Sequence, residues 1–239
     1  METLSGKVAF VTGGSRGIGL AIAYALAAEG AHVAITGRSD KHLSAARKRI
    51  ESAGPGSVET LQADVKDYAA VEHAIGAAVA RFGGLDILVN NAGIGIFADA
   101  AEMTPVQWAD VIGTNLTGVF NACHAAIPHL RKRRGGFIIN ISSLAGKNAF
   151  AGGSAYCASK AGLNAFSEAL MQEVRYDDIR VSYVMPGSVA TGFNNGDAEK
   201  GADWKIAADE VAEVVVNLLR HPARSLPSRV ELRPSKPRK

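Results

Sequence analysis

Short apolar runs alternate along this chain with stretches that have helical periodicity. In 8–11 and 87–89 every residue is apolar, which is typical of parallel strands covered by helices on both faces. The alternation predicts βαβ units, and therefore an α/β fold with a doubly wound parallel sheet of about seven strands flanked by helices on both faces. The predicted strands are 7–11, 32–36, 58–63, 85–90, 137–141, 180–184 and 229–232, and the predicted helices are 17–29, 40–53, 67–82, 104–133, 153–177 and 208–220.

Length and composition favour one folded unit. The 239 residues are 47% hydrophobic and 21% charged, which suits a chain that buries a large core, and no repeat or linker divides them. We expect a single domain over 1–233. A segment without periodicity at about 192–207 is a candidate lid, and 234–239 is expected to be a frayed basic tail.

Charge and cysteine content argue against several classes of protein. The net charge of +3 is small and the basic clusters contain no interleaved aromatic residues, so no nucleic-acid partner is expected. No apolar run reaches bilayer length and no signal-peptide pattern precedes the first strand, so we expect no membrane partner and a cytoplasmic location. Cys123 and Cys157 lack metal-ligand spacing, so they are expected to be small buried residues, and no metal site is expected.

A glycine-rich turn lies between the first predicted strand and the first predicted helix. Gly13, Gly17 and Gly19 lack a Cβ atom, which allows a tight bend and lets a pyrophosphate approach the helix N-terminus. The spacing G-x-x-x-G-x-G differs from the common G-x-G-x-x-G, and glycines after a strand can also simply form a turn. With the strand and helix around it, the turn predicts a Rossmann-type dinucleotide site.

The residues after the second strand indicate which nicotinamide cofactor the site accepts. A carboxylate there would bind the ribose hydroxyls and repel a 2′-phosphate, whereas an arginine would attract one. The segment 36–39 contains Arg38 and no carboxylate, and Arg16 lies in the glycine turn. These residues favour NADP(H); the alternative is that both arginines are solvated surface cations.

Tyr156 and Lys160 stand four residues apart in a predicted helix, and such residues share a face. A nearby ammonium favours the phenolate, so Lys160 is expected to lower the pKa of Tyr156 toward the operating pH. Tyr156 would then serve as a proton donor or acceptor. Taken singly, a tyrosine would more often be a packed aromatic and a lysine a solvated cation; their pairing is what indicates an active site.

The motifs and their order resemble those of the classical short-chain dehydrogenase/reductase family, and in particular its 3-oxoacyl-acyl-carrier-protein reductases. The resemblance runs from Gly6 to about Leu232. It rests on the turn 12–19, Asp64-Val65, the run 90–93 (Asn-Asn-Ala-Gly), Asn115, Ser143, Tyr156-x-x-x-Lys160 and Pro186-Gly187-x-x-x-Thr191.

The resemblance implies a catalytic role for Asn115, Ser143, Tyr156 and Lys160. Tyr156 would exchange a proton with the substrate oxygen, Ser143 would orient that oxygen, and Lys160 would assist Tyr156 and hold the nicotinamide ribose. Asn115 would keep a water in a proton relay, or would satisfy backbone groups at a break in its helix. Ser142 is chemically equal to Ser143, but the family places its serine thirteen residues before the tyrosine, as Ser143 is here.

The resemblance also implies a set of cofactor contacts. Asp64 and Val65 would line the adenine pocket, although Asp64 could instead cap the next helix. The implied set is Gly13, Ser15, Arg16, Gly17, Ile18, Gly19, Arg38, Asp64, Val65, Asn91, Ala92, Gly93, Tyr156, Lys160, Pro186, Gly187, Val189 and Thr191.

The expected function is hydride transfer from NADPH to a ketone, aldehyde or 3-oxoacyl thioester. An NAD-dependent alcohol dehydrogenase and a catalytically silent nucleotide sensor are the alternatives. Family members associate through the long helices after the fourth and fifth strands, so a homodimer is expected. The segment 228–234 departs from the glycine-rich C-terminus of the ketoreductases, and it leaves both a tetramer and a 3-oxoacyl substrate open.

Overall fold

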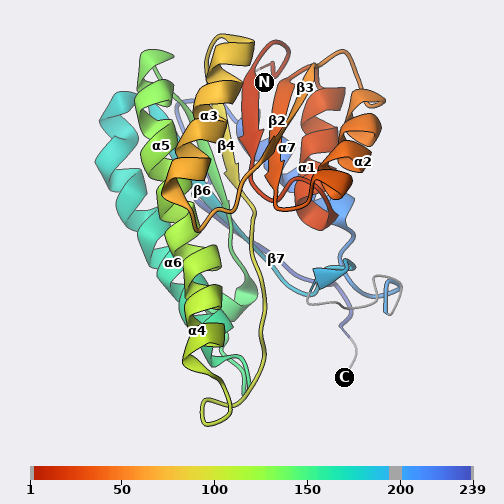
Figure 1. Cartoon of the computed structure of the whole chain (residues 1–239), viewed down its shortest axis with the longest axis vertical. Coiled ribbons are helices and arrows are strands. Elements are labelled where there is room, and N and C mark those ends of the chain that lie inside the picture. The colour runs from red at the N-terminus through yellow and green to blue at the C-terminus, as the bar shows by residue number, and fades with distance from the viewer. Residues whose placement is uncertain (1–2, 194–200, 238–239) are drawn as a thin grey trace.

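A seven-stranded parallel sheet forms the centre of the molecule (Figure 1). The computed structural model describes residues 3–193 and 201–237. The sheet order is β3-β2-β1-β4-β5-β6-β7, which confirms the predicted doubly wound α/β fold. The strands are β1 (Val8–Val11), β2 (His32–Gly37), β3 (Val58–Gln62), β4 (Ile87–Asn90), β5 (Gly136–Ile141), β6 (Ile179–Pro186) and β7 (Arg229–Leu232).

Helices cover both faces of the sheet (Figure 1). One hydrophobic core contains residues of α1, α2 and α7, and the other contains residues of α3, α5 and α6. The helices are α1 (Gly17–Ala28), α2 (Asp40–Glu51), α3 (Tyr68–Phe82), α4 (Pro105–Ile112), α5 (Gly118–Lys132), α6 (Ser154–Val174) and α7 (Ala208–Leu219).

The uninterrupted apolar runs follow from burial on two sides. Ala9 and Val11 pack in the first core, whereas Val8 and Phe10 pack in the second, because successive side chains of a strand point to opposite faces. All four residues of β1 are buried.

The predicted helix 104–133 is not continuous. Thr104 caps α4 in a reciprocal capping box with Gln107, and a π-helical segment at Gly113–Thr117 separates α4 from α5. The predicted helix 153–177 likewise ends at Val174 and is followed by a short 3₁₀ turn. Hydrophobic periodicity continues through both junctions; only the break at Asn115 was an expectation, and its π-helical form was not.

The predicted lid and tail lie partly outside the described residues, at 194–200 and 238–239. The described end of the lid is attached to the body, because Ala190 N–H donates to the carbonyl of Ile206 at 2.8 Å. Pro234, the first residue of the expected tail, lies beside Gly187, where a Cβ atom would be 3.0 Å from Pro234 Cδ. The frayed tail over 234–239 stays a prediction.

Asp86 joins three segments at the amino edge of the sheet. Its carboxylate accepts a hydrogen bond from Val8 N–H at 2.9 Å and pairs with the Arg133 guanidinium at 3.1 Å. Lys7 Nζ lies 3.6 Å from the same carboxylate. The Asp86 side chain is only 10% exposed, so its loss would leave a buried N–H group without a partner.

We expect Asp86→Ala to lower the free energy of unfolding by about 2–4 kcal/mol, because a buried, charge-assisted contact is lost. Asp177→Ala is the matched control, since it removes an exposed pair with Arg131 and should cost at most about 1 kcal/mol. Urea denaturation measures both. Equal losses in the two variants would contradict the role assigned to Asp86.

Candidate active site

The glycine turn provides backbone space and unpaired N–H groups at the start of α1. Gly17 has φ +56°, a conformation that glycine adopts without strain. A Cβ atom on Gly19 would lie 2.3 Å from Asn91 Nδ2 and 2.4 Å from the Gly13 carbonyl, so only glycine fits there. No side chain caps α1, and its first turn contains no acidic residue. These features fit a bound pyrophosphate, which accepts from such N–H groups.

Thr12 and Asn91 tie the glycine turn to the loop after β4. Thr12 Oγ1 accepts hydrogen bonds from the backbone N–H groups of Asn91 and Ala92, at 3.0 and 3.1 Å. The Asn91 amide donates in return to the carbonyls of Thr12 and Gly13, at 3.0 and 3.1 Å. The side chain of Asn91 therefore holds the turn in place, and Ala92 and Gly93 follow it at the carboxyl edge of the sheet.

Cationic side chains surround the end of β2. Arg16 and Arg38 are exposed. In the part of the chain that the structure describes, neither side chain forms an ion pair or hydrogen bond. A Cβ atom on Gly37 would lie 3.0 Å from Ser15 Oγ, which places Ser15 beside the same strand end. This arrangement fits a phosphate group better than a ribose diol.

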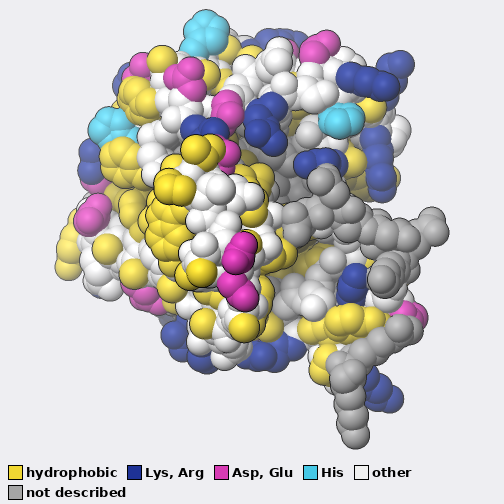
Figure 2. All heavy atoms as spheres, turned by 60° about the horizontal axis from the view of Figure 1, so that its bottom comes forward, with side chains coloured by type: hydrophobic (Ala, Val, Ile, Leu, Met, Phe, Trp, Pro, Cys, Tyr) yellow, Lys and Arg dark blue, Asp and Glu magenta, His cyan; other side chains and the backbone are white. Residues whose placement is uncertain are grey.

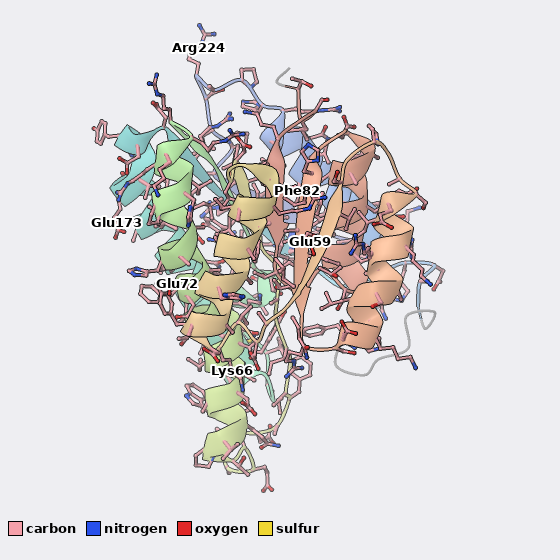
Figure 3. The ribbon with its side chains drawn as sticks, turned by 45° about the horizontal axis from the view of Figure 1, so that its top comes forward. Glu59, Lys66, Glu72, Phe82, Glu173 and Arg224 are labelled. Atoms are coloured by element: carbon pink, nitrogen blue, oxygen red, sulfur yellow. The ribbon has the colours of Figure 1, made fainter. Side chains whose placement is uncertain are left out.

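Asp64 has a local role in the backbone, and the predicted alternative that it caps α3 is wrong. Asp64 Oδ1 accepts from Lys66 N–H at 3.0 Å, whereas the cap of α3 is Asp67, which accepts from Ala70 N–H. Lys66 itself pairs with Asp110 of α4 at 2.7 Å, where the loop before α3 meets that helix (Figure 3). Val65, in the same loop, is buried.

Asn115 lies in the π-helical segment and is completely buried. Its amide accepts from Ile94 N–H at 2.8 Å and donates to the Ile94 carbonyl at 2.9 Å, so it fixes the chain just after Gly93. The amide also donates to Ser159 Oγ at 3.0 Å. The interpretation that Asn115 satisfies backbone groups at a helix break agrees with this geometry.

Ser159 connects Asn115 to the backbone of α6, and nothing in the sequence indicated this role. Its hydroxyl donates to the Tyr156 carbonyl at 2.7 Å while it accepts from Asn115. A serine in mid-helix gives no sequence signal for such a role, because a bond back to its own helix is common.

The two neighbouring serines after β5 have different environments. Ser142 is buried, and its hydroxyl donates to Asn164 Oδ1 at 2.5 Å, so it faces the body of α6. Ser143 accepts from Ala145 N–H at 3.1 Å, and its hydroxyl is near enough to Tyr156 to lower the pKa of that phenol. This geometry distinguishes Ser143 from Ser142, which the residue types alone could not do.

Lys160 is buried, and its Nζ lies 5.9 Å from the centre of the Tyr156 ring. The ammonium donates to the carbonyl of Ile141, the last residue of β5, at 2.9 Å. Burial lowers the pKa of Lys160 to about 8, because the charged form loses hydration.

The expected lowering of the Tyr156 pKa is not found. Burial raises the pKa of Tyr156, and the hydrogen bond with Ser143 only partly opposes this shift. The prediction failed because it considered the charge of Lys160 but not the removal of both groups from water, which disfavours phenolate and ammonium alike.

The loop after β6 approaches the glycine turn. Gly187 N–H donates to the Leu232 carbonyl at 2.8 Å, so β7 supports the start of this loop beside Pro186. Val189 forms an isolated parallel bridge with Ile206. A Cβ atom on Gly17 would lie 3.6 Å from Thr191, so the loop and the turn meet across the crevice between β1 and β4, where the order of the strands reverses.

A buried polar chain underlies the site and was also not foreseen. Asn90 donates to Asn140 Oδ1 at 2.9 Å, and Asn140 donates to Ser167 Oγ of α6 at 2.9 Å. Asn90 also approaches Cys123 Sγ, and burial raises the pKa of that thiol to about 12. Both cysteines are free and buried, as expected.

Two further observations concern the described residues. Residues 3–193 and 201–237 contain no group of three or more His, Cys, Asp or Glu side chains that could hold a metal ion. Within the same residues, none of the helices combines the length and apolar character needed to cross a bilayer.

Comparisons with known proteins agree with this geometry. The acetoacetyl-CoA reductase of Shinella zoogloeoides is 39% identical over 226 residues, which cover 89% of this chain and 90% of that protein. The 3-oxoacyl-acyl-carrier-protein reductase of Haemophilus influenzae is 40% identical over 188 residues, or 79% and 76% of the two chains. A metagenomic short-chain oxidoreductase solved in complex with NADP is 38% identical, covers 99% of this chain and 100% of its own, and has a TM-score of 0.86.

The family described as short chain dehydrogenase matches residues 7–201. That range contains the glycine turn, Asn115, Ser143, Tyr156 and Lys160. The chain belongs to the short-chain dehydrogenase/reductase family of oxidoreductases, and within that family it is similar to the 3-oxoacyl-acyl-carrier-protein reductases.

Proposed function

We propose that this oxidoreductase reduces a carbonyl compound with NADPH and that Tyr156 is its general acid. The observation that carries the proposal is the convergence of three side chains at the carboxyl edge of the sheet. Ser143 lies close enough to Tyr156 to lower the pKa of its phenol, and the Lys160 ammonium lies 5.9 Å from the ring of Tyr156. A nucleotide sensor needs no such proton donor.

Each residue has a role that its contacts support. NADPH supplies the hydride when it is bound. Tyr156 is a neutral phenol at neutral pH, as an ordinary tyrosine is, and burial raises its pKa further, so the phenol is in the form that can donate to a carbonyl oxygen. Ser143 orients that oxygen through its hydroxyl, and Lys160 provides a buried cation that stabilises the phenolate left behind.

Asn115 positions the site and does not itself exchange a proton with the substrate. Its three hydrogen bonds, to both backbone groups of Ile94 and to Ser159, hold the loop after Gly93 against α6. A proton relay through a water at Asn115 remains part of the proposal. Its support is the closeness of Asn115 Oδ1 and Lys160 Nζ to Gly93, where a Cβ atom would lie 3.4 and 3.7 Å from them.

Tyr156→Phe tests the proposed acid directly. The variant keeps the ring but loses the transferable proton, so kcat for carbonyl reduction should fall roughly 10²- to 10⁴-fold. The dissociation constant for NADPH, followed by nucleotide fluorescence, should change little. Tyr183→Phe is the control, because that hydroxyl bonds to Glu168 away from the site. Turnover close to that of the unmodified protein in Tyr156→Phe would exclude the assignment.

A nucleotide sensor would bind NADPH but would not oxidise it. That result with the unmodified protein, across a broad panel of ketones, aldehydes and acyl thioesters, would favour a sensor. Oxidation of alcohols with NAD in preference to carbonyl reduction would favour an alcohol dehydrogenase.

The preference for NADP(H) rests on Arg16 and Arg38. Arg38→Asp replaces a cation by a carboxylate, so the affinity for NADPH should fall roughly 10- to 100-fold while the affinity for NADH falls much less. Lys48→Asp is the control, because Lys48 is exposed on the same side of the sheet in α2 but two turns farther along the helix. Titration of each nucleotide gives both constants. An unchanged ratio of NADPH to NADH affinity in Arg38→Asp would refute the assignment.

The buried Lys160 predicts a dependence of stability on pH. Its pKa is about 8 in the folded chain and 10.5 in the reference state. Between these values the unfolded chain binds more protons, so stability rises with pH. Relative to Lys160→Met, the free energy of unfolding should increase by about 2–3 kcal/mol from pH 8 to pH 10. Urea titrations at several pH values measure the difference, and a constant difference would show that burial does not lower this pKa.

We also propose a homodimer and a cytoplasmic location. Support for the dimer comes from apolar side chains that remain exposed on α4 and α5, namely Val106, Trp108 and Phe120. Figure 2 shows hydrophobic side chains gathered on the end of the molecule where α4 lies. Support for the location comes from two free cysteines, which suit a reducing compartment.

A further inference from the structure

Two phenylalanines from separate loops lie against the ring of Tyr156, and a third packs on one of them. Phe97 follows β4 and meets the Tyr156 ring edge-on, with centroids 5.6 Å apart and planes at 80°. Phe193 follows β6 and lies 5.8 Å from the same ring. Phe150 precedes α6 and lies 5.7 Å from Phe97. We call these three residues the aromatic wall.

The aromatic wall is more exposed than large apolar side chains usually are. Phe97, Phe150 and Phe193 are 44%, 48% and 41% exposed. Rings of this size contribute most to stability when they are buried, so an exposed group of them beside a reactive hydroxyl indicates a surface that a ligand covers.

Two glycines allow the rings to approach the site. A Cβ atom on Gly95 would lie 2.8 Å from Phe193 and 2.9 Å from Phe97, and one on Gly153 would lie 2.4 Å from Phe150. Larger residues at these positions would push the rings outward. The local backbone is therefore compatible with this arrangement of the wall.

The loops that hold Phe97 and Phe150 are joined to one another. Ala98 N–H donates to the Gly152 carbonyl at 2.8 Å, so two rings of the wall sit on connected backbone. Such preorganisation lowers the entropy cost of binding a flat ligand.

A carboxylate lies near the aromatic wall. Asp99 follows Phe97 by two residues, and its Oδ1 lies 3.8 Å from the position of a Cβ atom on Gly152. A carboxylate at this point disfavours an anionic group on the part of a substrate that packs on the wall.

We infer that the substrate is an uncharged aryl ketone or aldehyde, whose ring packs on the aromatic wall while its carbonyl oxygen meets Tyr156. This inference rests on the proposed function. In the reaction the carbonyl carbon accepts a hydride and the oxygen accepts the Tyr156 proton. The C=O bond becomes CH–OH, and the dihydronicotinamide is oxidised.

The test compares acetophenone with cyclohexyl methyl ketone, which has a saturated ring of similar size. Aromatic pairs add modestly to the effect of burial, so kcat/KM for acetophenone should be higher by roughly 3- to 10-fold. Acetoacetyl-coenzyme A, which is anionic, should be the poorest substrate of the three.

Variants of the aromatic wall test whether its rings cause the preference for acetophenone over cyclohexyl methyl ketone. Phe97→Leu and Phe193→Leu keep an apolar side chain but lose the ring, so each should reduce the ratio of the two kcat/KM values to roughly 1–2. Phe97→Tyr keeps the ring, so its ratio should equal that of the unmodified protein. Tyr176→Leu is the control, because Tyr176 is an exposed aromatic beyond the end of α6 and should leave the ratio unchanged.

The ratio separates recognition of the ring from damage to the site. A displaced Tyr156 would slow both ketones equally and leave the ratio intact, which would overturn the assignment of the wall. Equal kcat/KM for the two ketones in the unmodified protein, or a preference for acetoacetyl-coenzyme A, would overturn the inference while the proposed function stands. Lack of turnover with all carbonyl compounds would overturn the proposed function itself.

Discussion

The link between Thr12 and Asn91 is the contact on which the site depends. It joins the turn after β1 to the loop after β4, at the point where the order of the sheet reverses. Parallel strands leave their carboxyl ends at one edge, and helices that start there present unpaired N–H groups. Without this link the glycine turn and the loop after β4 would not be held together. With it, both face the same crevice.

A second constraint is the cost of burying polar groups behind that crevice. Lys160 is held by one carbonyl of β5, and Asn115 is held by Ile94 and Ser159. Each contact compensates for lost hydration, and together they join β5, the π-helical segment and α6. The shifts in pKa follow from the same burial. Tyr156 is a neutral hydrogen-bond donor, and the pKa of Lys160 is lowered toward neutral pH.

The active site is polar on one side of Tyr156 and apolar on the other. Ser143 interacts with its hydroxyl, whereas Phe97 and Phe193 pack against its ring. The polar side is where the proposed carbonyl reduction would position its proton. The apolar side lies on loops that connect the elements of the sheet, where substrate specificity can change without disturbing the strands.

The sequence by itself determined the α/β class, the parallel sheet and the positions of the glycine turn, Ser143, Tyr156 and Lys160, because these depend on local periodicity and on short spacings. It did not reveal the π-helical form of the break at Asn115, the role of Ser159, the separate environments of Ser142 and Ser143 or the direction in which the pKa of Tyr156 shifts. Only the tertiary structure decided these, since each depends on which groups from distant parts of the chain meet and on how much water they lose. The aromatic wall belongs with them, because its three rings come from three loops that only the folded sheet brings together.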